Sequence, residues 1–341
     1  MKAIRIHKCG GPEVLRWETV PDPLCLPNQV LVQMKAMSIN HLDIWVRNGL
    51  FNYPLPIIMG SDGAGVIVEV GQEVEGWKVG DAVIIQPGTY CGNCQFCQKG
   101  KENICADYGI LGETENGTQC ELMALNSEQL ERKPDFLSFE EAAAFPLVFL
   151  TSYSMLIRRA KIQNRETILI LGAGSGVGSA AIQIAKLYNC RIIATGGDEK
   201  KLQLAKSLGA DYVINHSAEI IHKRVKEITD GVGADIVFEH VGEATWNSSL
   251  KSLRRGGRLV TCGATTGANV SINLRHLFIK NLSILGSTMG DRKAFSEVVE
   301  WLAQGKIKPV VDRVFSMSEV AKAHVHIENR QQFGKVVLVP E

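Results

Sequence analysis

The sequence lacks three features, and each absence excludes a class of protein. No stretch of the 341 residues approaches the roughly 18 consecutive apolar residues that a membrane helix needs. The net charge of +1 provides no field for binding nucleic acid or an anionic membrane. The first residues carry charge every few positions and lack the apolar run of a signal peptide, so we expect a cytoplasmic protein.

The chain contains nine cysteines, but we do not expect a disulfide framework. Cys91, Cys94, Cys97 and Cys105 follow the spacing Cys-x2-Cys-x2-Cys-x7-Cys, which suits tetrahedral Zn²⁺. A closed site of four thiolates is structural rather than catalytic, so the sequence predicts one structural zinc per chain. The other cysteines are scattered, and we expect small buried side chains at Cys9, Cys25, Cys120, Cys190 and Cys262.

The hydrophobic pattern changes near residue 140. Before it, short β segments lie between Pro, Gly and Asp, at 30–34, 65–70 and 81–85. After it, strands alternate with helices: strands at 167–171, 191–195, 212–215, 235–238 and 258–262, and helices at 179–188, 199–208 and 218–228. This alternation predicts an α/β fold with a doubly wound parallel sheet. A helix at 291–304 and a strand at 334–339 follow.

A glycine-rich turn, residues 172–178, lies between the first of these strands and its helix. Glycine permits a tight turn and lets the backbone approach a pyrophosphate at the positive helix N-terminus. The strict G-x-G-x-x-G fingerprint is not met, because Val177 occupies its last position, and a merely tight turn is the alternative. In the strand-turn-helix-strand context we expect the cofactor to bind at Ala173, Gly174, Ser175, Gly176, Val177 and Gly178.

The end of the second strand discriminates between NAD(H) and NADP(H). A carboxylate there would bind the ribose hydroxyls of NAD, whereas small or basic residues leave room for the 2′-phosphate of NADP. Gly196 stands where the carboxylate is expected, and Lys200 and Lys201 follow it. A longer strand would instead make Asp198 the ribose ligand, and the alternative for both lysines is a solvated helix face. The segment favours NADP(H) over NAD(H).

Several motifs in the right order resemble the medium-chain dehydrogenase/reductase superfamily over essentially the whole chain. Residues 60–65 with Val70-Gly71 are similar to its early signature, and the cysteine quartet is similar to its structural-zinc lobe. Residues 172–178 are similar to its cofactor turn, and residues 205–211 to the segment after the second strand of its cofactor domain. The resemblance implies a mostly β, GroES-like catalytic domain with a Rossmann NAD(P)-binding domain inserted into it. The expected bounds are 1–125 for the GroES-like domain with its zinc lobe at 88–108, 126–288 for the Rossmann domain, and 289–341 for the C-terminal return to the catalytic domain.

The zinc-dependent alcohol dehydrogenases of this superfamily carry a catalytic zinc on Cys, His and Cys. The matching positions here are Asn40, Ser61 and Leu147. Leu cannot ligate a metal, and Asn and Ser are poor zinc ligands, so the resemblance implies that this zinc is lost. Ile39-Asn-His-Leu-Asp43 instead resembles the quinone oxidoreductase branch, the zeta-crystallin type. That branch usually lacks the structural zinc lobe too, so this chain is intermediate.

Without a Lewis-acid metal, hydride addition to a C=C conjugated with a carbonyl is easier than reduction of a simple ketone, because the charge spreads into an enolate. We therefore expect an NADPH-dependent oxidoreductase that reduces an enone, a quinone or an enoyl thioester. The resemblance implies that Asn40 orients the carbonyl, with a structural amide as the alternative. We expect Asp43 to orient a neighbouring group, with catalytic proton transfer as the alternative. The resemblance also implies that Lys201 and His216 contact the 2′-phosphate, with an ordinary polar residue at a strand end as the alternative for His216. Lys335 is a weaker candidate for the pyrophosphate.

Two other functions stay open. One is an alcohol dehydrogenase or carbonyl reductase of the zinc-containing family, and the other is a crystallin-like or nucleic-acid-binding role without catalysis. Near-zero net charge argues against nucleic acid. The expected partners are a small-molecule substrate and further copies of the chain, in a homo-oligomer that is a dimer or tetramer. A basic group would meet a CoA phosphate or form a solvated face: Lys251, Arg254, Arg255 and Arg258.

Overall fold

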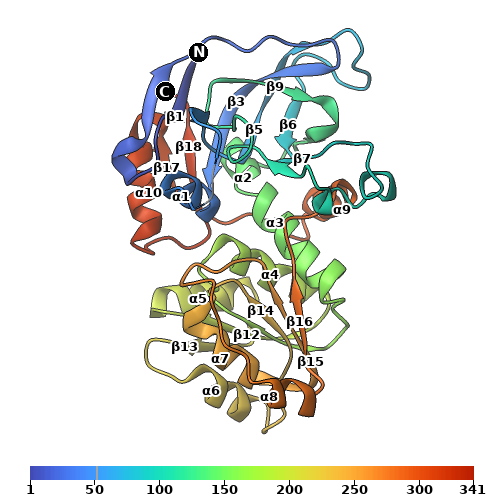
Figure 1. The fold of residues 1–341 in the computed structure, drawn as a ribbon, viewed down its shortest axis with the longest axis vertical. Helices are drawn as coiled ribbons and strands as arrows, with labels where there is room; N and C mark the ends of the chain where they lie inside the picture. Colours follow the sequence, from blue (N-terminus) through green and yellow to red (C-terminus); the bar gives the residue numbers. More distant parts are fainter. Residues whose placement is uncertain (51–52) are drawn as a thin grey trace. The chain divides into compact units, whose positions relative to one another are not determined.

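The computed structural model describes residues 1–50 and 53–341, which form two compact units (Figure 1). The first unit comprises Met1–Leu147 together with Gly290–Glu341, and the second comprises Val148–Met289. The chain thus leaves the first unit once and returns to it.

The first unit continues past residue 125, for a reason visible in its pairing. Strand β10 (Leu130–Arg132) pairs with β6 (Ala82–Ile85), and helix α2 (Phe139–Ala143) packs on strands of the same sheet. The division therefore falls later, within helix α3 (Pro146–Tyr153).

The first unit is built mainly from β-strands. Its largest sheet has seven strands, in the order β10-β6-β5-β3-β18-β17 with β9 also paired to β3. The bounds are β3 (Gln29–Ile39), β5 (Asp62–Val70), β9 (Leu122–Asn126), β17 (Val311–Ser316) and β18 (Lys335–Val339). Antiparallel pairing places Val336 of β18 opposite Ile39 of β3. This register brings Lys335, at the start of one strand, close to Asn40, just beyond the end of the other.

Smaller elements complete the first unit. A three-stranded sheet pairs β2-β1-β4, and a two-stranded sheet pairs β7 with β8. The bounds are β1 (Lys2–Ile6), β2 (Arg16–Thr19), β4 (Ile57–Ile58), β7 (Gly88–Thr89), β8 (Gly109–Ile110), α1 (His41–Asn48), α9 (Arg292–Ala303) and α10 (Val320–Glu328).

The second unit confirms the predicted doubly wound sheet. Its six strands pair in the order β13-β12-β11-β14-β15-β16, and every neighbouring pair is parallel. The bounds are β11 (Thr167–Ile170), β12 (Arg191–Gly196), β13 (Tyr212–Asn215), β14 (Ala234–Glu239), β15 (Leu253–Thr261) and β16 (Ser283–Gly286). The strand order reverses between β11 and β14. Ligands of such sheets bind beyond the carboxyl ends of the strands at that switch point.

Side-chain caps set where two helices of the second unit begin. Ser175 Oγ accepts the backbone N–H of Gly178 at 2.9 Å, and Asp198 Oδ1 accepts that of Lys201 at 2.9 Å. Gly209, with φ of 117°, ends the second of these helices in the left-handed region. The bounds are α4 (Gly176–Leu187), α5 (Glu199–Leu208), α6 (Ile221–Ile228), α7 (Glu243–Ser252) and α8 (Leu274–Ile279).

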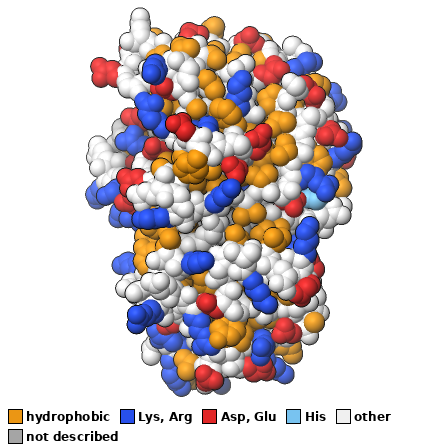
Figure 2. All heavy atoms as spheres, turned by 180° about the vertical axis from the view of Figure 1, so that it is seen from behind, with side chains coloured by type: hydrophobic (Ala, Val, Ile, Leu, Met, Phe, Trp, Pro, Cys, Tyr) orange, Lys and Arg blue, Asp and Glu red, His pale blue; other side chains and the backbone are white. Residues whose placement is uncertain are grey.

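Each unit has its own apolar core. In the second unit the strands supply fully buried side chains such as Leu169, Ile193 and Val237. On the outside, charged residues of both signs are interspersed over the face shown in Figure 2, as the small net charge implies. Within residues 1–50 and 53–341, no helix is long and apolar enough to cross a membrane.

Candidate functional site

The cysteine quartet lies in a lobe between β7 and β8, whose pairing joins the two ends of the lobe. The Sγ atoms of Cys91, Cys94, Cys97 and Cys105 all lie within 4.8 Å of one another, and three of the separations are 3.5, 3.6 and 3.9 Å. A tetrahedral Zn²⁺ with bonds of about 2.3 Å places its sulfur ligands about 3.8 Å apart. The quartet therefore fits a structural zinc that crosslinks the lobe. Across the described parts of the chain, it is the one such group of His, Cys, Asp or Glu side chains.

The glycine-rich turn follows β11 at the switch point of the parallel sheet. Gly178 must lack a side chain, because a Cβ there would lie 2.4 Å from the carbonyl oxygen of Gly172. This close approach seats the first turn of α4 against the strand, with its free N–H groups directed beyond the sheet edge. The turn thus has the shape and the helix N-terminus that a pyrophosphate requires.

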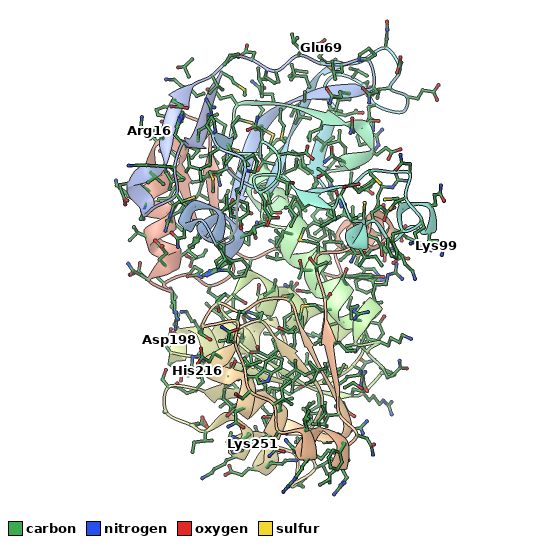
Figure 3. The ribbon with its side chains drawn as sticks, viewed as in Figure 1. Arg16, Glu69, Lys99, Asp198, His216 and Lys251 are labelled. Carbon is green, nitrogen blue, oxygen red and sulfur yellow. The ribbon has the colours of Figure 1, made fainter. Side chains whose placement is uncertain are left out.

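The predicted 2′-phosphate residues come together at the ends of β12 and β13. A Cβ on Gly196 would lie 2.9 Å from Leu202 Cδ2, so a carboxylate side chain does not fit there without displacing Leu202. His216 Nε2 would lie 3.1 Å from a Cβ on Gly197, the residue before Asp198, and both His216 and Asp198 are labelled in Figure 3.

Lys201 links this corner to the glycine-rich turn. A Cβ on Gly174 would lie 3.0 Å from Lys201 Cδ, so the lysine side chain extends across the turn. Strand β12 ends at Gly196, and Asp198 caps α5 while its carboxylate lies 3.5 Å from Lys201 Nζ. Asp198 is thus engaged within its own helix, and the strand is not extended toward it.

Sequence reasoning missed His240, which lies beside the same turn on the other side of the switch point. Its Nε2 lies 2.8 Å from the carbonyl oxygen of Leu171 and 3.3 Å from Ser175 Oγ. A carbonyl only accepts, so Nε2 carries a proton and His240 pins the turn to the end of β14. Burial lowers the pKa of His240, with the carboxylate of neighbouring Glu239 opposing that shift. The signal in the sequence is a His-Val-Gly directly after a buried strand.

In the first unit, Asn40 and Asp43 meet at the start of α1. The carboxylate Oδ2 of Asp43 accepts the backbone N–H of Asn40 at 2.6 Å. Asp43 is 1% exposed, and burial raises its pKa to about 7, with Lys335 opposing and Asp62 adding to the shift. Its Oδ1 has no hydrogen-bond partner among the described residues. A protonated and an ionised carboxyl are therefore both accessible near neutral pH.

Asp62, which the sequence did not single out, is the centre of this buried cluster. Its Oδ2 accepts from Asn40 Nδ2 at 2.9 Å, from Ser38 Oγ at 3.1 Å and from Lys335 Nζ at 2.8 Å, while its Oδ1 accepts the backbone N–H of Leu147 at 2.8 Å. Lys335 Nζ also donates to Asn40 Oδ1. The side chains of Lys335 and Asp62 are 4% and 0% exposed. In this structure the lysine predicted as a pyrophosphate candidate is bonded inside the first unit.

The positions that match catalytic zinc ligands do converge, but they do not form a metal site. Asn40 and Leu147 both bond to Asp62, the latter only through its backbone N–H. Ser61 Oγ is buried and has no partner within the described residues. The ammonium group of Lys335 is bonded into the same cluster and would repel a divalent cation. The donor set therefore does not fit a catalytic zinc.

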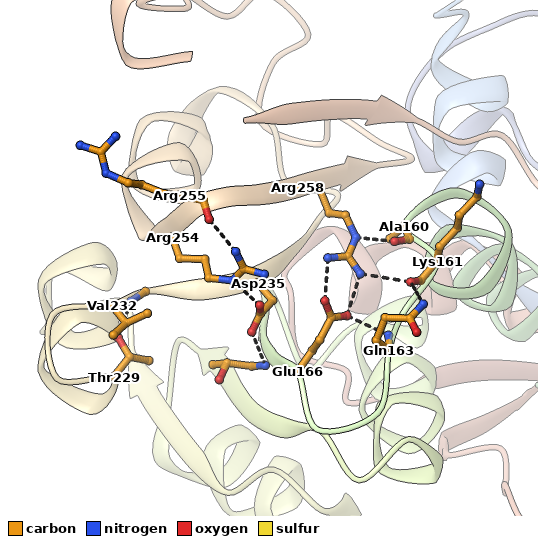
Figure 4. A network of polar contacts seen from close by, with 12 residues as sticks. Ala160, Lys161, Gln163, Glu166, Thr229, Val232, Asp235, Arg254, Arg255 and Arg258 are labelled. Atoms are coloured by element: carbon orange, nitrogen blue, oxygen red, sulfur yellow. Dashed lines mark hydrogen bonds and ion pairs between the residues drawn. The ribbon is translucent and has the colours of Figure 1, made fainter. Parts of the chain in front are cut away.

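The basic group suggested for a CoA phosphate is largely engaged in structural pairs (Figure 4). Arg258 donates to both carboxylate oxygens of Glu166, at 2.8 and 2.6 Å, and Arg254 pairs with Asp235. Arg255 donates to the carbonyl of Ile279 at 2.7 Å. These bonds fasten β14 and β15 to neighbouring segments, so the arginines are explained as part of the fold.

The two folds and their sites define a class of nucleotide-binding dehydrogenases, and comparison with known proteins identifies the family. Residues 26–135 match the model of the alcohol dehydrogenase GroES-like domain, and residues 176–304 match that of the zinc-binding dehydrogenases. The chain belongs to the medium-chain dehydrogenase/reductase superfamily and is of the zinc-type alcohol dehydrogenase-like kind. It is an oxidoreductase of this family.

Named relatives cover nearly the whole chain. An NAD-dependent alcohol dehydrogenase of Sulfurisphaera tokodaii is 32% identical over 100% of both chains, and a quinone oxidoreductase of Pseudomonas aeruginosa is 32% identical over 99% of both. A crotonyl-CoA reductase of Streptomyces avermitilis is 32% identical, covering 94% of this chain and 80% of the relative. A solved structure of an NAD-dependent alcohol dehydrogenase is 43% identical with a TM-score of 0.97, over 99% of both chains. The relatives thus differ in substrate.

Proposed function

We propose that this protein is an NADPH-dependent reductase of an activated C=C bond or a quinone, and that it works without a catalytic metal. The observation that carries the proposal is the buried cluster of Asn40, Asp62 and Lys335, in which Asn40 stands at the position of one catalytic zinc ligand and the ammonium of Lys335 is bonded beside it. Relatives named quinone oxidoreductase and crotonyl-CoA reductase support the same class of substrate. The bound NADPH would supply the hydride.

We assign to Asn40 the role of binding the carbonyl group of the substrate. An amide carries two N–H donors, and the bond to Asp62 uses one of them. The second donor would hold the carbonyl oxygen and stabilise the negative charge that grows there as an enolate forms. Asp43 holds the backbone of Asn40 by accepting its N–H. The substrate α-carbon would take its proton from water or a nearby donor.

Cofactor binding is assigned to the second unit. The turn from Ala173 to Gly178 would hold the pyrophosphate, while Lys201 and His216 would contact the 2′-phosphate beside Gly196. Support for NADPH comes from the absence of a carboxylate at Gly196 and from the engagement of Asp198 as the cap of α5. A reducing compartment such as the cytoplasm would keep the four zinc-binding thiols reduced.

A homo-oligomer is also part of the proposal. Strand β16 is an edge of the six-stranded sheet, and an unpaired edge is a template for pairing with another chain. Helix α8, which directly precedes it, exposes Leu274, Phe278 and Ile279 to 68%, 64% and 54%. Exposed apolar side chains beside an open edge favour a second copy as the partner.

A second candidate is an alcohol dehydrogenase, which the solved relative with 43% identity favours. A substrate panel separates the two functions. Purified protein is incubated with NADPH or NADH and with enones, quinones, enoyl-CoA thioesters and aldehydes, and cofactor oxidation is followed. We expect turnover of a conjugated substrate with NADPH that survives metal chelation in the assay. Turnover of simple aldehydes alone would support the second candidate and reject the proposal.

A further inference from the structure

We propose that Lys335 is a positioning residue for hydride transfer, which acts through Asn40 by supplying a fixed positive charge to the amide that orients the substrate carbonyl. The inference rests on the proposed function, in which that amide stabilises the developing enolate. It gives Lys335 a role in the first unit that differs from pyrophosphate binding.

The contacts of Lys335 fix its charge at one place. Its Nζ donates to Asn40 Oδ1 and, at 2.8 Å, to Asp62 Oδ2, and the residue is 3% exposed. The start of β18 holds the backbone, because Lys335 N donates to Val310 O at 2.8 Å. An ammonium held in this way keeps its direction during a reaction, as a preorganised electrostatic group must.

Pairing with Asp62 alone does not explain the lysine. Asp62 already accepts hydrogen bonds from Asn40, Ser38 and Leu147, which are neutral donors. Replacing a buried ion pair with apolar residues is often neutral or stabilising, so stability is a weak reason for a buried ammonium. The bond to Asn40 Oδ1 is the contact that a simple ion pair would lack.

That bond changes what the amide can do. A charged donor on Oδ1 draws electron density through the amide and strengthens the remaining Nδ2–H as a donor. The Asp62 bond holds Nδ2 from the other side and sets the plane of the amide. A metal ion would place its positive charge directly on the substrate oxygen, whereas here the charge reaches it through one amide group.

Kinetics of substitutions at Lys335 test this role. Lys335→Gln keeps neutral donors for Asn40 and Asp62 but removes the charge, and Lys335→Arg keeps the charge. Loss of one direct donor costs about 100- to 1000-fold in kcat, so a charge acting through a donor should cost about 10- to 100-fold. We expect that loss in kcat for Lys335→Gln with an unchanged Kd for NADPH, and partial rescue by Lys335→Arg. Lys322→Gln, at an exposed lysine paired with Glu319, is the matched control.

A double-mutant cycle tests the route through Asn40. In an Asn40→Ala background, Lys335→Gln should cost little more, since the group through which it acts is gone. Losses in kcat that multiply in the double variant would overturn the inference. A raised Kd for NADPH with unchanged kcat would also overturn it, because that pattern is the signature of pyrophosphate binding. If Lys335→Gln fails to fold, Lys335→Met combined with Asp62→Asn removes both charges and takes its place in the cycle.

A spectroscopic measurement separates this inference from the proposed function. The side-chain amide of Asn40 is observed by NMR in protein labelled with ¹⁵N-asparagine and assigned by its loss in Asn40→Asp. We expect its ¹H and ¹⁵N shifts to move in Lys335→Gln and to stay unchanged in Lys322→Gln. Unmoved shifts would overturn the inference whatever the enzyme reduces. A wild type that turns over no conjugated substrate, with shifts that do move, would reject the proposed function alone.

Discussion

The cysteine lobe and the Asn40 cluster lie in the same unit but differ in the source of positive charge. The lobe offers ligands for a metal cation, whereas the cluster already contains a cationic side chain. The lobe brings four thiolates within 4.8 Å of one another, a set that suits tetrahedral Zn²⁺. The Asn40 cluster brings together an amide, a carboxylate and the ammonium of Lys335, which already supplies a cation. The lobe thus fits a zinc that serves the fold, whereas in the proposed function the charge for chemistry comes from the side chain of Lys335.

Removing zinc from the lobe should have the largest effect on stability. Structural zinc sites bind with free energies on the order of 10 kcal/mol, which becomes folding energy of the segment they close. We expect Cys94→Ser/Cys97→Ser to unfold residues 88–108 locally, as seen by faster hydrogen exchange there. Cofactor binding in the second unit should not change. Unchanged exchange in the lobe would show that it folds without metal.

The next largest effect on stability should come from breaking the Asp62–Lys335 ion pair of the Asn40 cluster. Asp62→Ala leaves the Lys335 ammonium buried without its carboxylate. An uncompensated buried charge costs about 3–5 kcal/mol, so we expect a fall of that size in the free energy of unfolding, measured by urea denaturation. Asp81→Ala, which breaks a pair with the exposed side chain of Arg132, provides the comparison and should cost less. Equal losses of unfolding free energy in the two variants would mean that burial does not make the Asp62–Lys335 pair more important to stability than the Asp81–Arg132 pair.

Asp43 makes the same region sensitive to pH. Its folded pKa of about 7 lies above the ordinary 3.8, so its contribution to stability is complete below pH 4 and is lost as pH rises through 7. Asn at this position keeps an acceptor for the Asn40 N–H but cannot ionise. We expect Asp43→Asn to gain stability relative to wild type between pH 4 and 8, by up to about 4 kcal/mol. A difference in unfolding free energy that is constant with pH would refute this assignment.

The smallest expected effect concerns the cofactor. Lys201→Ala removes a cation beside the proposed 2′-phosphate site and should raise the Kd for NADPH about 10-fold, or about 1.4 kcal/mol, with little change for NADH. Lys206→Ala, on the same helix, serves as the control. Fluorescence titration measures both values. An unchanged Kd for NADPH would remove Lys201 from the site.

Local patterns in the sequence predicted most of the parallel sheet. Buried strands read as apolar runs, so the prediction of 191–195 and 212–215 matches β12 and β13 within a residue. Strand β16 and helix α8 were missed, because a short edge strand and a helix with exposed apolar residues carry no clear periodicity. The cysteine spacing likewise predicted the quartet, since its ligands are close in sequence.

The Asn40 cluster could be predicted only in part, because its members meet through long-range pairing. Lys335 reaches Asn40 by the register of β18 against β3, across almost the whole chain, and nothing near either residue encodes that register. Asp62 stands beside Ser61 in a motif already noted, and a carboxylate among small residues was the available clue in the sequence. Resemblance identified the positions, but only the structure gave their bonds.

The metal content of the active enzyme tests the central claim most directly. Purified protein is analysed for zinc by mass spectrometry, together with its kcat, for wild type and for Cys94→Ser/Cys97→Ser. If the four-cysteine lobe is the metal site, the wild type holds one zinc per chain and the variant holds none. The fraction of the variant that is folded should then retain the kcat of the wild type. Two zinc ions per chain in wild type, with one surviving in the variant and required for activity, would contradict it.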